Sequence, residues 1–117
     1  MPTPTTSPDN LAHLELLRLL EQHPEYSQRQ LSASLGISLG KTHYVLRALL
    51  DKGLVKAQNF RRSDSKLGYL YVLTPKGVHQ RFKLTQNFLV RKEREFETLQ
   101  TEIKALREEL AEQSAEV

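Results

Sequence analysis

Residues 36–42 read GISLGKT, and Gly-Lys-Thr is also how a phosphate-binding loop ends. Such a loop has the form G-x-x-x-x-G-K-[ST] and joins a strand to a helix, so that its backbone N–H groups surround a phosphate. Here only three residues separate Gly36 from Gly40, and the preceding SQRQLSASL lacks the β-branched run of a buried strand. The spacing and the context therefore argue against a nucleotide site, and this polar segment needs another interpretation.

Other catalytic or metal-binding arrangements are not visible in the sequence. The chain has no cysteine, which excludes disulfides, thiolate zinc sites and thiol redox chemistry. The four histidines, which do not have the spacing of a metal site, are His13, His23, His43 and His79. No nucleophile is paired with a base, and Glu95, Glu102 and Glu109 are better explained as charges that flank a coiled coil. We therefore expect no enzyme, no cofactor and no metal ion.

Positive charge is concentrated in the middle of the chain. Residues 26–92 hold 13 lysines and arginines against two acids, a net charge of +11, although the whole chain carries only +3. Residues 93–117 hold three basic residues against eight glutamates, a net charge of −5. A basic body with an acidic tail favours a domain that binds a polyanion, joined to a separate element. The alternative is a basic face that is merely solvated.

The length of 117 residues suits one domain with an extension. Residues 1–8 are rich in Thr, Ser and Pro and predict a flexible arm. This arm has no basic segment followed by an apolar one, and no run of about 18 apolar residues occurs in the chain. We therefore expect neither secretion nor a membrane span, and a cytoplasmic location.

Two short helices are predicted after the arm. The first covers residues 9–22, with Ser7 as its cap and Pro8 in its first turn. The second covers residues 27–35, where Ser27 and Gln30 have the spacing of a capping box. Near-helical spacing predicts one buried stripe on the first helix, formed by Leu11, Leu14, Leu17 and Leu20.

A third helix is predicted from Ser38 to Lys52, and Gly53 ends it. A helical wheel at about 100° per residue gives this helix one buried stripe and one free face. The buried stripe is Thr42, Val45, Leu46 and Leu49, and the free face is Gly40, Tyr44, Arg47 and Asp51. LVKAQNF and YLYVLT then predict two strands, joined by the basic connection RRSDSKLG.

A long helix is predicted from Thr74-Pro75 nearly to the end of the chain, and its apolar residues follow a heptad repeat. The a positions are Phe82, Leu89, Phe96, Ile103 and Leu110, and the d positions are Val78, Thr85, Lys92, Leu99 and Leu106. No other segment is left to cover this seam, so we expect a homodimer. Folding back on the same chain could account only for Val78 to Leu89. We expect residues 75–92 to pack partly against the body and the coiled coil to begin near Phe96.

This order of elements predicts a winged helix-turn-helix. The expected fold is mainly α with a small β-hairpin wing, followed by a long C-terminal coiled-coil dimerisation helix. The DNA-binding domain would cover residues 9–74 and the dimerisation helix residues 75–117. The turn QLSASLGIS supports this interpretation, because the small Ala33 precedes the turn and the apolar Ile37 follows it, where we expect it to enter the core.

In this architecture the third helix enters the major groove of DNA, while the second lies across the backbone. Arg47 suits a bidentate contact to guanine. The residues expected to contact bases are Ser38, Gly40, Lys41, His43, Tyr44 and Arg47. Those expected to contact phosphates are Ser27, Gln28 and Arg29, and those expected in the wing are Arg61, Arg62 and Lys66. Arg47 could instead be a solvated charge, Tyr44 could pack on the surface of the domain, and the wing arginines could belong to a merely soluble loop.

Three stretches of the chain carry a resemblance to a known family: SQRQLSASLGISLGKTHYVLRALLDKGLVKAQNF, KLGYLYVLTPKG and LTQNFLVRKEREFETLQTEIKALREE. They resemble the small MarR-type winged-helix regulators associated with bacterial exopolysaccharide gene clusters. The resemblance extends from about Leu11 to Glu109, although His43 stands where that pattern has an asparagine. It implies a sequence-specific transcriptional regulator that acts as a dimer. A small-molecule effector is not implied, because the extra helices of larger MarR proteins have no counterpart here.

The first hypothesis is therefore a homodimeric regulator that binds a two-fold symmetric site on double-stranded DNA through residues 38–47 of each subunit. An architectural protein that coats nucleic acid without sequence preference would use the same basic face. An adaptor would use its coil to recruit a different coiled coil. The coil direction stays open at this point, because Glu102 facing Arg107 of the partner subunit favours a parallel pair by only about 0.3 kcal/mol. The operator, the regulated genes and the choice between activation and repression are equally open.

Overall fold

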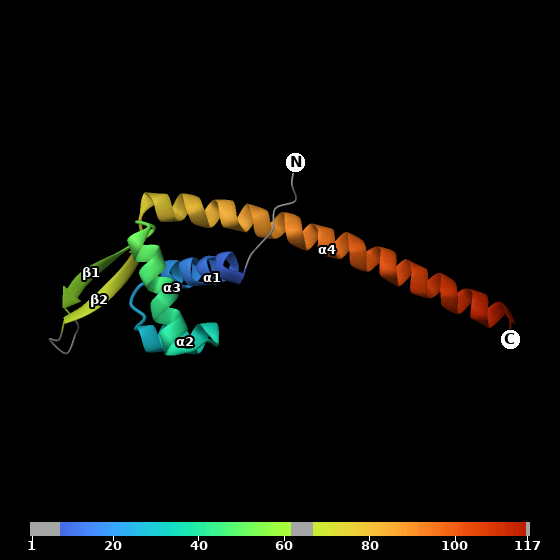
Figure 1. Cartoon of the computed structure of the whole chain (residues 1–117), viewed down its shortest axis with the longest axis horizontal. Helices are drawn as coiled ribbons and strands as arrows, with labels where there is room; N and C mark the ends of the chain where they lie inside the picture. The colour runs from blue at the N-terminus through green and yellow to red at the C-terminus, as the bar shows by residue number, and fades with distance from the viewer. Residues whose placement is uncertain (1–7, 62–66, 117) are drawn as a thin grey trace.

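The computed structural model describes residues 8–61 and 67–116, and the side chains of residues 10–60 and 68–116. In chain order, the elements are α1 (Pro8–Gln22), α2 (Gln28–Leu35), α3 (Leu39–Asp51), β1 (Val55–Arg61), β2 (Leu67–Leu73) and α4 (Pro75–Glu116). Helix α1 lies between α4 and the α2–α3 pair, the hairpin extends from one side of this body, and α4 projects beyond the other (Figure 1). This is the expected mainly helical winged fold. Arg62 and Lys66 lie outside the described residues.

Local signals start α2 and α4 and end α2 and α3 as predicted, whereas Ser7, the predicted cap of α1, and the rest of the predicted arm before Pro8 lie outside the described residues. Ser27 forms the expected capping box, in which its N–H donates to Gln30 Oε1 (2.8 Å) and its Oγ accepts from the N–H of Gln30 (3.2 Å). Thr74 Oγ1 accepts from the N–H of Gly77 in the first turn of α4. Gly36 (φ 67°) and Gly53 (φ 72°) occupy the left-handed conformation just after α2 and α3, where glycine carries little steric cost.

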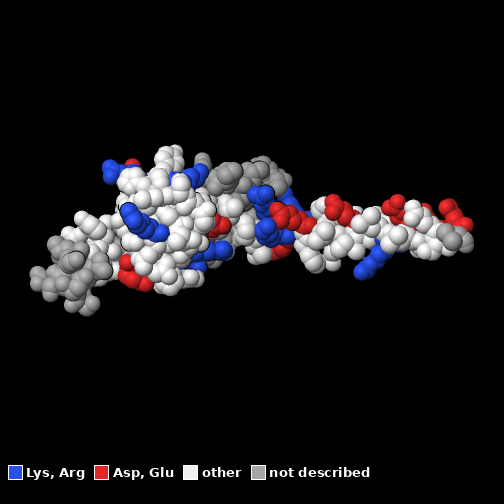
Figure 2. Space-filling model, turned by 90° about the horizontal axis from the view of Figure 1, so that it is seen from below, with Lys and Arg blue, Asp and Glu red and all other residues white. Residues whose placement is uncertain are grey.

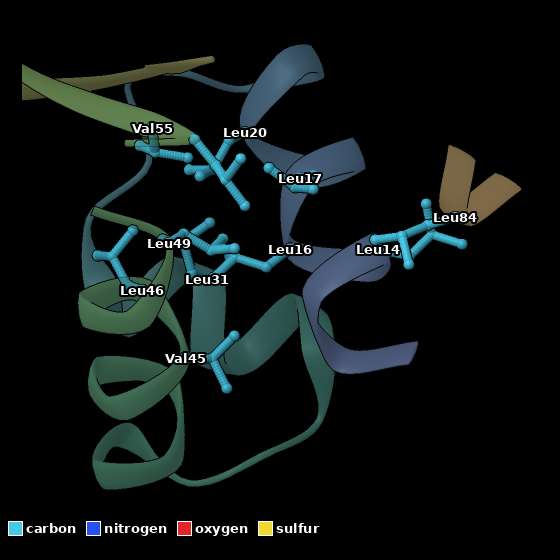
Figure 3. Packing of buried hydrophobic residues seen from close by; sticks show 11 residues of the cluster. Leu14, Leu16, Leu17, Leu20, Leu31, Val45, Leu46, Leu49, Val55 and Leu84 are labelled. Atoms are coloured by element: carbon cyan, nitrogen blue, oxygen red, sulfur yellow. The ribbon is translucent and has the colours of Figure 1, made fainter. Parts of the chain in front are cut away.

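The core is built around α1, which is buried on more than the single predicted stripe. Leu14, Leu17 and Leu20 are buried as expected, but Leu16 is also fully buried and Leu11 is only half-buried. The reason is that α1 packs on two sides: Leu14 points toward Leu84 of α4, while Leu16 points toward α2 and α3 (Figure 3). A helix covered on two sides must be apolar on both.

Helix α3 shows the predicted division of its surface. Its buried residues are Thr42, Val45, Leu46 and Leu49. Ile37, which was expected to enter the core, is only half-buried because the turn between α2 and α3 runs along the surface. The buried stripe holds α3 on the body and leaves its opposite face to the solvent.

The two strands pair antiparallel, from Val55 opposite Leu73 to Arg61 opposite Leu67. The second strand begins two residues earlier than predicted, because pairing continues through Leu67 and Gly68. The hairpin is attached to the body where the Tyr71 N–H donates to the Pro24 carbonyl (3.0 Å). None of the described helices is both long and apolar enough to cross a membrane.

Helix α4 contacts the body through a face that is not its heptad seam. Gly77 and Leu84 are buried, and Phe88 packs at the edge of the core. Val78, Phe82 and Leu89 are each more than half exposed, so the possible fold-back of the seam from Val78 to Leu89 does not occur. Val78 and Leu89 are rotated by about 100° from the packed residues, because each follows a packed residue, Gly77 or Phe88, by one position.

Beyond Phe88, every described residue of α4 is exposed. The contact with the body therefore ends earlier than the predicted residue 92. At about 1.5 Å per residue, the free segment from Leu89 to Glu116 is about 42 Å long, which accounts for the long dimension of the 76 × 34 × 22 Å molecule. A long helix whose seam is wholly apolar from Phe96 onward is left without intrachain cover.

Candidate nucleic-acid interface

A polar link between α2 and α3 sets how the two helices cross. Ser32 Oγ lies 2.8 Å from Thr42 Oγ1 and 2.9 Å from the carbonyl oxygen of Gln28. The Thr42 hydroxyl donates to the Ser38 carbonyl (2.9 Å), and the residue is completely inaccessible to solvent. Thr42 of the GKT segment is therefore a buried connector between helices and cannot contact a phosphate or a hydrated metal ion.

Thr42→Val tests this link, because valine keeps the shape of threonine and removes its hydroxyl. We expect the free energy of unfolding to fall by about 1 kcal/mol, the usual net contribution of one such hydrogen bond. Urea denaturation at fixed protein concentration measures the change. The matched control is Thr101→Val in α4, whose exposed hydroxyl donates only to the Glu97 carbonyl of its own helix. Equal losses for the two variants would contradict a special role for Thr42.

The free face of α3 and its two flanks carry most of the side chains that were predicted to contact bases. Tyr44 is 68% exposed, and Lys41, His43 and Arg47 are also exposed. A Cβ added to Gly40 would have no neighbour within 4 Å, so the backbone there is open to a close approach. Leu39, which was not predicted to take part, is exposed on the first turn as well. The structure thus gathers most of the predicted base contacts on one accessible surface.

Two of the hydroxyl groups that were predicted to contact DNA already cap the starts of α3 and α2. Ser38 Oγ accepts from the Lys41 N–H (3.1 Å), and Ser27 Oγ is used in its capping box. Each hydroxyl keeps its proton available for a further hydrogen bond, because an Oγ that accepts one bond can still donate another. Arg29, two residues after Ser27, is exposed, and among the described residues its guanidinium takes no part in capping the helix.

Gln28 and His43 contact each other, a pairing that the sequence did not predict. The Gln28 Oε1 atom lies 3.2 Å from His43 Nδ1. An amide oxygen only accepts, so this contact requires the proton on Nδ1 and leaves Nε2 of a neutral ring free to accept another hydrogen bond. Gln28, which was predicted to contact phosphates, therefore orients His43, which was predicted to contact bases. No local signal connects them, because 15 residues separate them in the chain.

Arg47 forms an exposed ion pair with Asp51, with 3.3 Å between Nε and Oδ1. The four-residue spacing on one helix face could have predicted this pair. Such pairs contribute only about 0.3–0.5 kcal/mol, less than the roughly 1–3 kcal/mol of discrimination from a bidentate arginine–guanine contact. Asp51 therefore holds Arg47 on the outer face without preventing an exchange of partners.

Three further contacts with DNA were predicted for residues of the wing. The side chain of Arg61 and all of Arg62 and Lys66 lie outside the described residues, so their predicted contacts stay predictions. Figure 2 shows basic side chains on the body and acidic ones along the projecting part of α4. In this view some acidic side chains also lie on the body, while the projecting rod carries mainly acidic ones.

Comparison with known proteins agrees with this geometry. Residues 9–56 match the family described as winged helix-turn-helix DNA-binding. No curated protein shows significant sequence similarity to the chain. A PadR-like transcriptional regulator from Bacillus cereus superimposes with a TM-score of 0.69 at 20% identity, over 77% of this chain and 92% of that one.

Two MarR proteins have the same fold. A MarR family protein from Mycobacterium tuberculosis, solved with p-aminosalicylic acid, has a TM-score of 0.59 at 21% identity, over 95% of this chain and 79% of that one. MarR from E. coli without ligand has a TM-score of 0.56 at 21% identity, over 81% and 76%. Residues 9–56 thus match a family of winged helix-turn-helix DNA-binding domains, and the chain shares the winged-helix fold of these MarR and PadR-like regulators.

Proposed function

We propose that this protein is a sequence-specific transcriptional regulator that binds a two-fold symmetric site on double-stranded DNA as a homodimer. The observation that carries the proposal is the free polar face of α3, which presents Lys41, His43, Tyr44 and Arg47 while its opposite stripe is anchored in the core. This is the arrangement a helix needs to enter a major groove. The basic body supplies attraction to phosphates, and Arg47 with its neighbours supplies the sequence preference.

The heptad seam of α4 supports the homodimer. Its apolar residues are between 39% and 64% exposed in the single chain: Phe82, Leu89, Phe96, Leu99, Ile103, Leu106 and Leu110. A long apolar stripe of this kind, interrupted only at Thr85 and Lys92, marks an interface, and a heptad repeat is the pattern that a coiled coil covers. Two copies related by a two-fold axis would match a palindromic site. In this proposal residues 9–74 bind DNA and residues 75–117 dimerise, and the resemblance to exopolysaccharide-associated regulators points to operators in such gene clusters.

Selection from random double-stranded DNA at physiological salt, with wild type beside Arg47→Ala, tests the proposal. We expect the wild type to enrich an inverted repeat, and Arg47→Ala to bind that repeat about 5- to 150-fold more weakly, since a bidentate contact discriminates by about 1–3 kcal/mol. Lys104→Ala is the matched control, because it removes one exposed positive charge from the acidic part of α4. It should leave the selected affinity unchanged.

The other outcomes separate the rival functions. Equal loss on random and selected DNA for Arg47→Ala would assign this side chain to phosphates instead of bases. A pool that stays random would favour the architectural protein, which the net charge of +11 over residues 26–92 would also suit. A monomeric mass for the protein alone would favour the adaptor, whose seam requires a different chain.

A further inference from the structure

The two halves of α4 carry opposite charges. Residues 75–94, the basic half, contain six lysines and arginines against one glutamate, a net charge of +5. Residues 95–116, the acidic half, contain seven glutamates against two basic residues, a net charge of −5. In Figure 2 acidic side chains recur along the projecting end of the rod, and a basic cluster lies where the rod leaves the body. Two copies of this helix are complementary in charge when they run in opposite directions.

We propose that the two α4 helices of the dimer pair antiparallel, with the basic half of each against the acidic half of the other. This inference rests on the proposed homodimer and adds its direction. Packed helices lie about 8–10 Å apart, about one Debye length at physiological salt, so the facing halves attract each other. A parallel pair would place basic beside basic and acidic beside acidic along the whole coil.

The heptad positions allow this pairing along the entire seam. With residue 94 at the centre, the a positions of one helix face the d positions of the other. Phe82 then meets Leu106 of the partner subunit, and Leu89 meets Leu99 of the partner subunit. The large apolar residues of the basic half are thereby covered by those of the acidic half.

Lys92, at a d position, distinguishes the two directions. In a parallel pair it would face its own copy across the seam, so that two like charges would meet in an apolar interface. In the antiparallel pair it lies beside Phe96 of the partner subunit, where its alkyl stem can pack while the ammonium stays in solvent. Within one chain this ammonium already lies 5.3 Å from the centre of the Phe88 ring and 3.0 Å from Glu95 Oε2.

Two individual contacts favour the parallel direction instead, and both contribute little free energy. A parallel pair gains the exposed contact between Glu102 and Arg107 of the partner subunit. The antiparallel pair brings its two Glu95 side chains toward the centre. Each Glu95, however, already accepts from Lys92 (3.0 Å) and Arg91 (3.1 Å), and the Lys92 hydrogen bond is the main cause that lowers the pKa of Glu95. The charge at the centre is thus compensated within each chain.

The body leaves the basic half of the seam accessible to a partner. Gly77, Leu84 and Phe88 face the core, whereas Val78 and Phe82 point away from it and stay exposed. The acidic half of a second α4 can therefore reach the exposed side chains of Val78 and Phe82 on the basic half. The antiparallel coil then extends over the whole seam instead of beginning near Phe96.

Distances between two spin labels test the direction, and the absence of cysteine makes single-cysteine variants straightforward. Ser114→Cys places a label near the C-terminal end of each helix. The antiparallel register puts residue 114 opposite residue 74, so the two labels would lie about 60 Å apart at about 1.5 Å per residue. In a parallel pair they would lie side by side, within about two helix diameters or about 20 Å.

Thr98→Cys is the matched control, because this exposed neutral position lies near the centre and gives a short distance in both directions. A long distance at position 114 with a short one at position 98 is the expected result. Short distances at both positions would overturn the antiparallel direction and leave the homodimer standing. The lack of any defined distance at either position, together with a monomeric mass, would overturn the homodimer itself.

Discussion

Replacing Leu99 by glutamate is expected to turn the dimer into monomers and to remove high-affinity binding to the selected DNA. Leu99 lies in the wholly apolar part of the seam and is 52% exposed in the single chain. Losing a buried leucine costs about 2–5 kcal/mol, and a two-fold dimer loses two. The dissociation constant of the dimer should therefore rise about a thousandfold or more, at about 1.4 kcal/mol per factor of ten. Burying the new carboxylates would add to this cost.

Sedimentation equilibrium and DNA titration measure the two consequences of Leu99→Glu separately. Thr101→Glu is the matched control, since it adds the same charge to the same exposed helix at an f position, away from the seam. The control should remain dimeric and bind DNA almost as the wild type does. A dimer that survives Leu99→Glu would remove the seam from the interface and would redirect the search to another surface.

Gly77→Ala is expected to destabilise the protein by about 3 kcal/mol, the upper end of the usual cost of overpacking. A Cβ at this position would overlap the carbonyl oxygen of Leu54, which is a backbone atom and cannot turn aside. That carbonyl also accepts from the Thr74 N–H (3.0 Å), and Lys76 Nζ donates to the nearby Lys52 carbonyl (3.1 Å). Relief of the overlap would have to break the bonds that hold the start of α4 on the body.

The sign of this effect makes the prediction specific. In an exposed helix, glycine to alanine normally stabilises by about 0.5–1 kcal/mol. Gly40→Ala in α3 is the matched control, because a Cβ there has no neighbour within 4 Å. Urea denaturation should therefore show opposite changes for the two variants. A stabilised Gly77→Ala protein would mean that α4 does not approach Leu54 closely in solution.

Signals that act over a few residues were sufficient to predict most of the fold. Ser27 with Gln30, Thr74 with Pro75, and the glycines after α2 and α3 each act through hydrogen bonds or backbone angles within about one helical turn. The wheel of α3 predicted its buried and free faces, because a helix has one fixed period. The heptad repeat of α4 predicted an apolar seam for the same reason.

Tertiary packing determined the contacts that the helical and heptad repeats could not predict. The contact of Gly77 with Leu54, the link from Ser32 to Thr42 and the approach of Gln28 to His43 join segments that are distant in the chain. Leu16 is buried because two neighbours cover α1, and no pattern within one helix states how many neighbours it will have. The same limit applied to α4, where the sequence contained both a body-facing side and a seam. Only the packed structure showed that they are different faces and that the seam is left free.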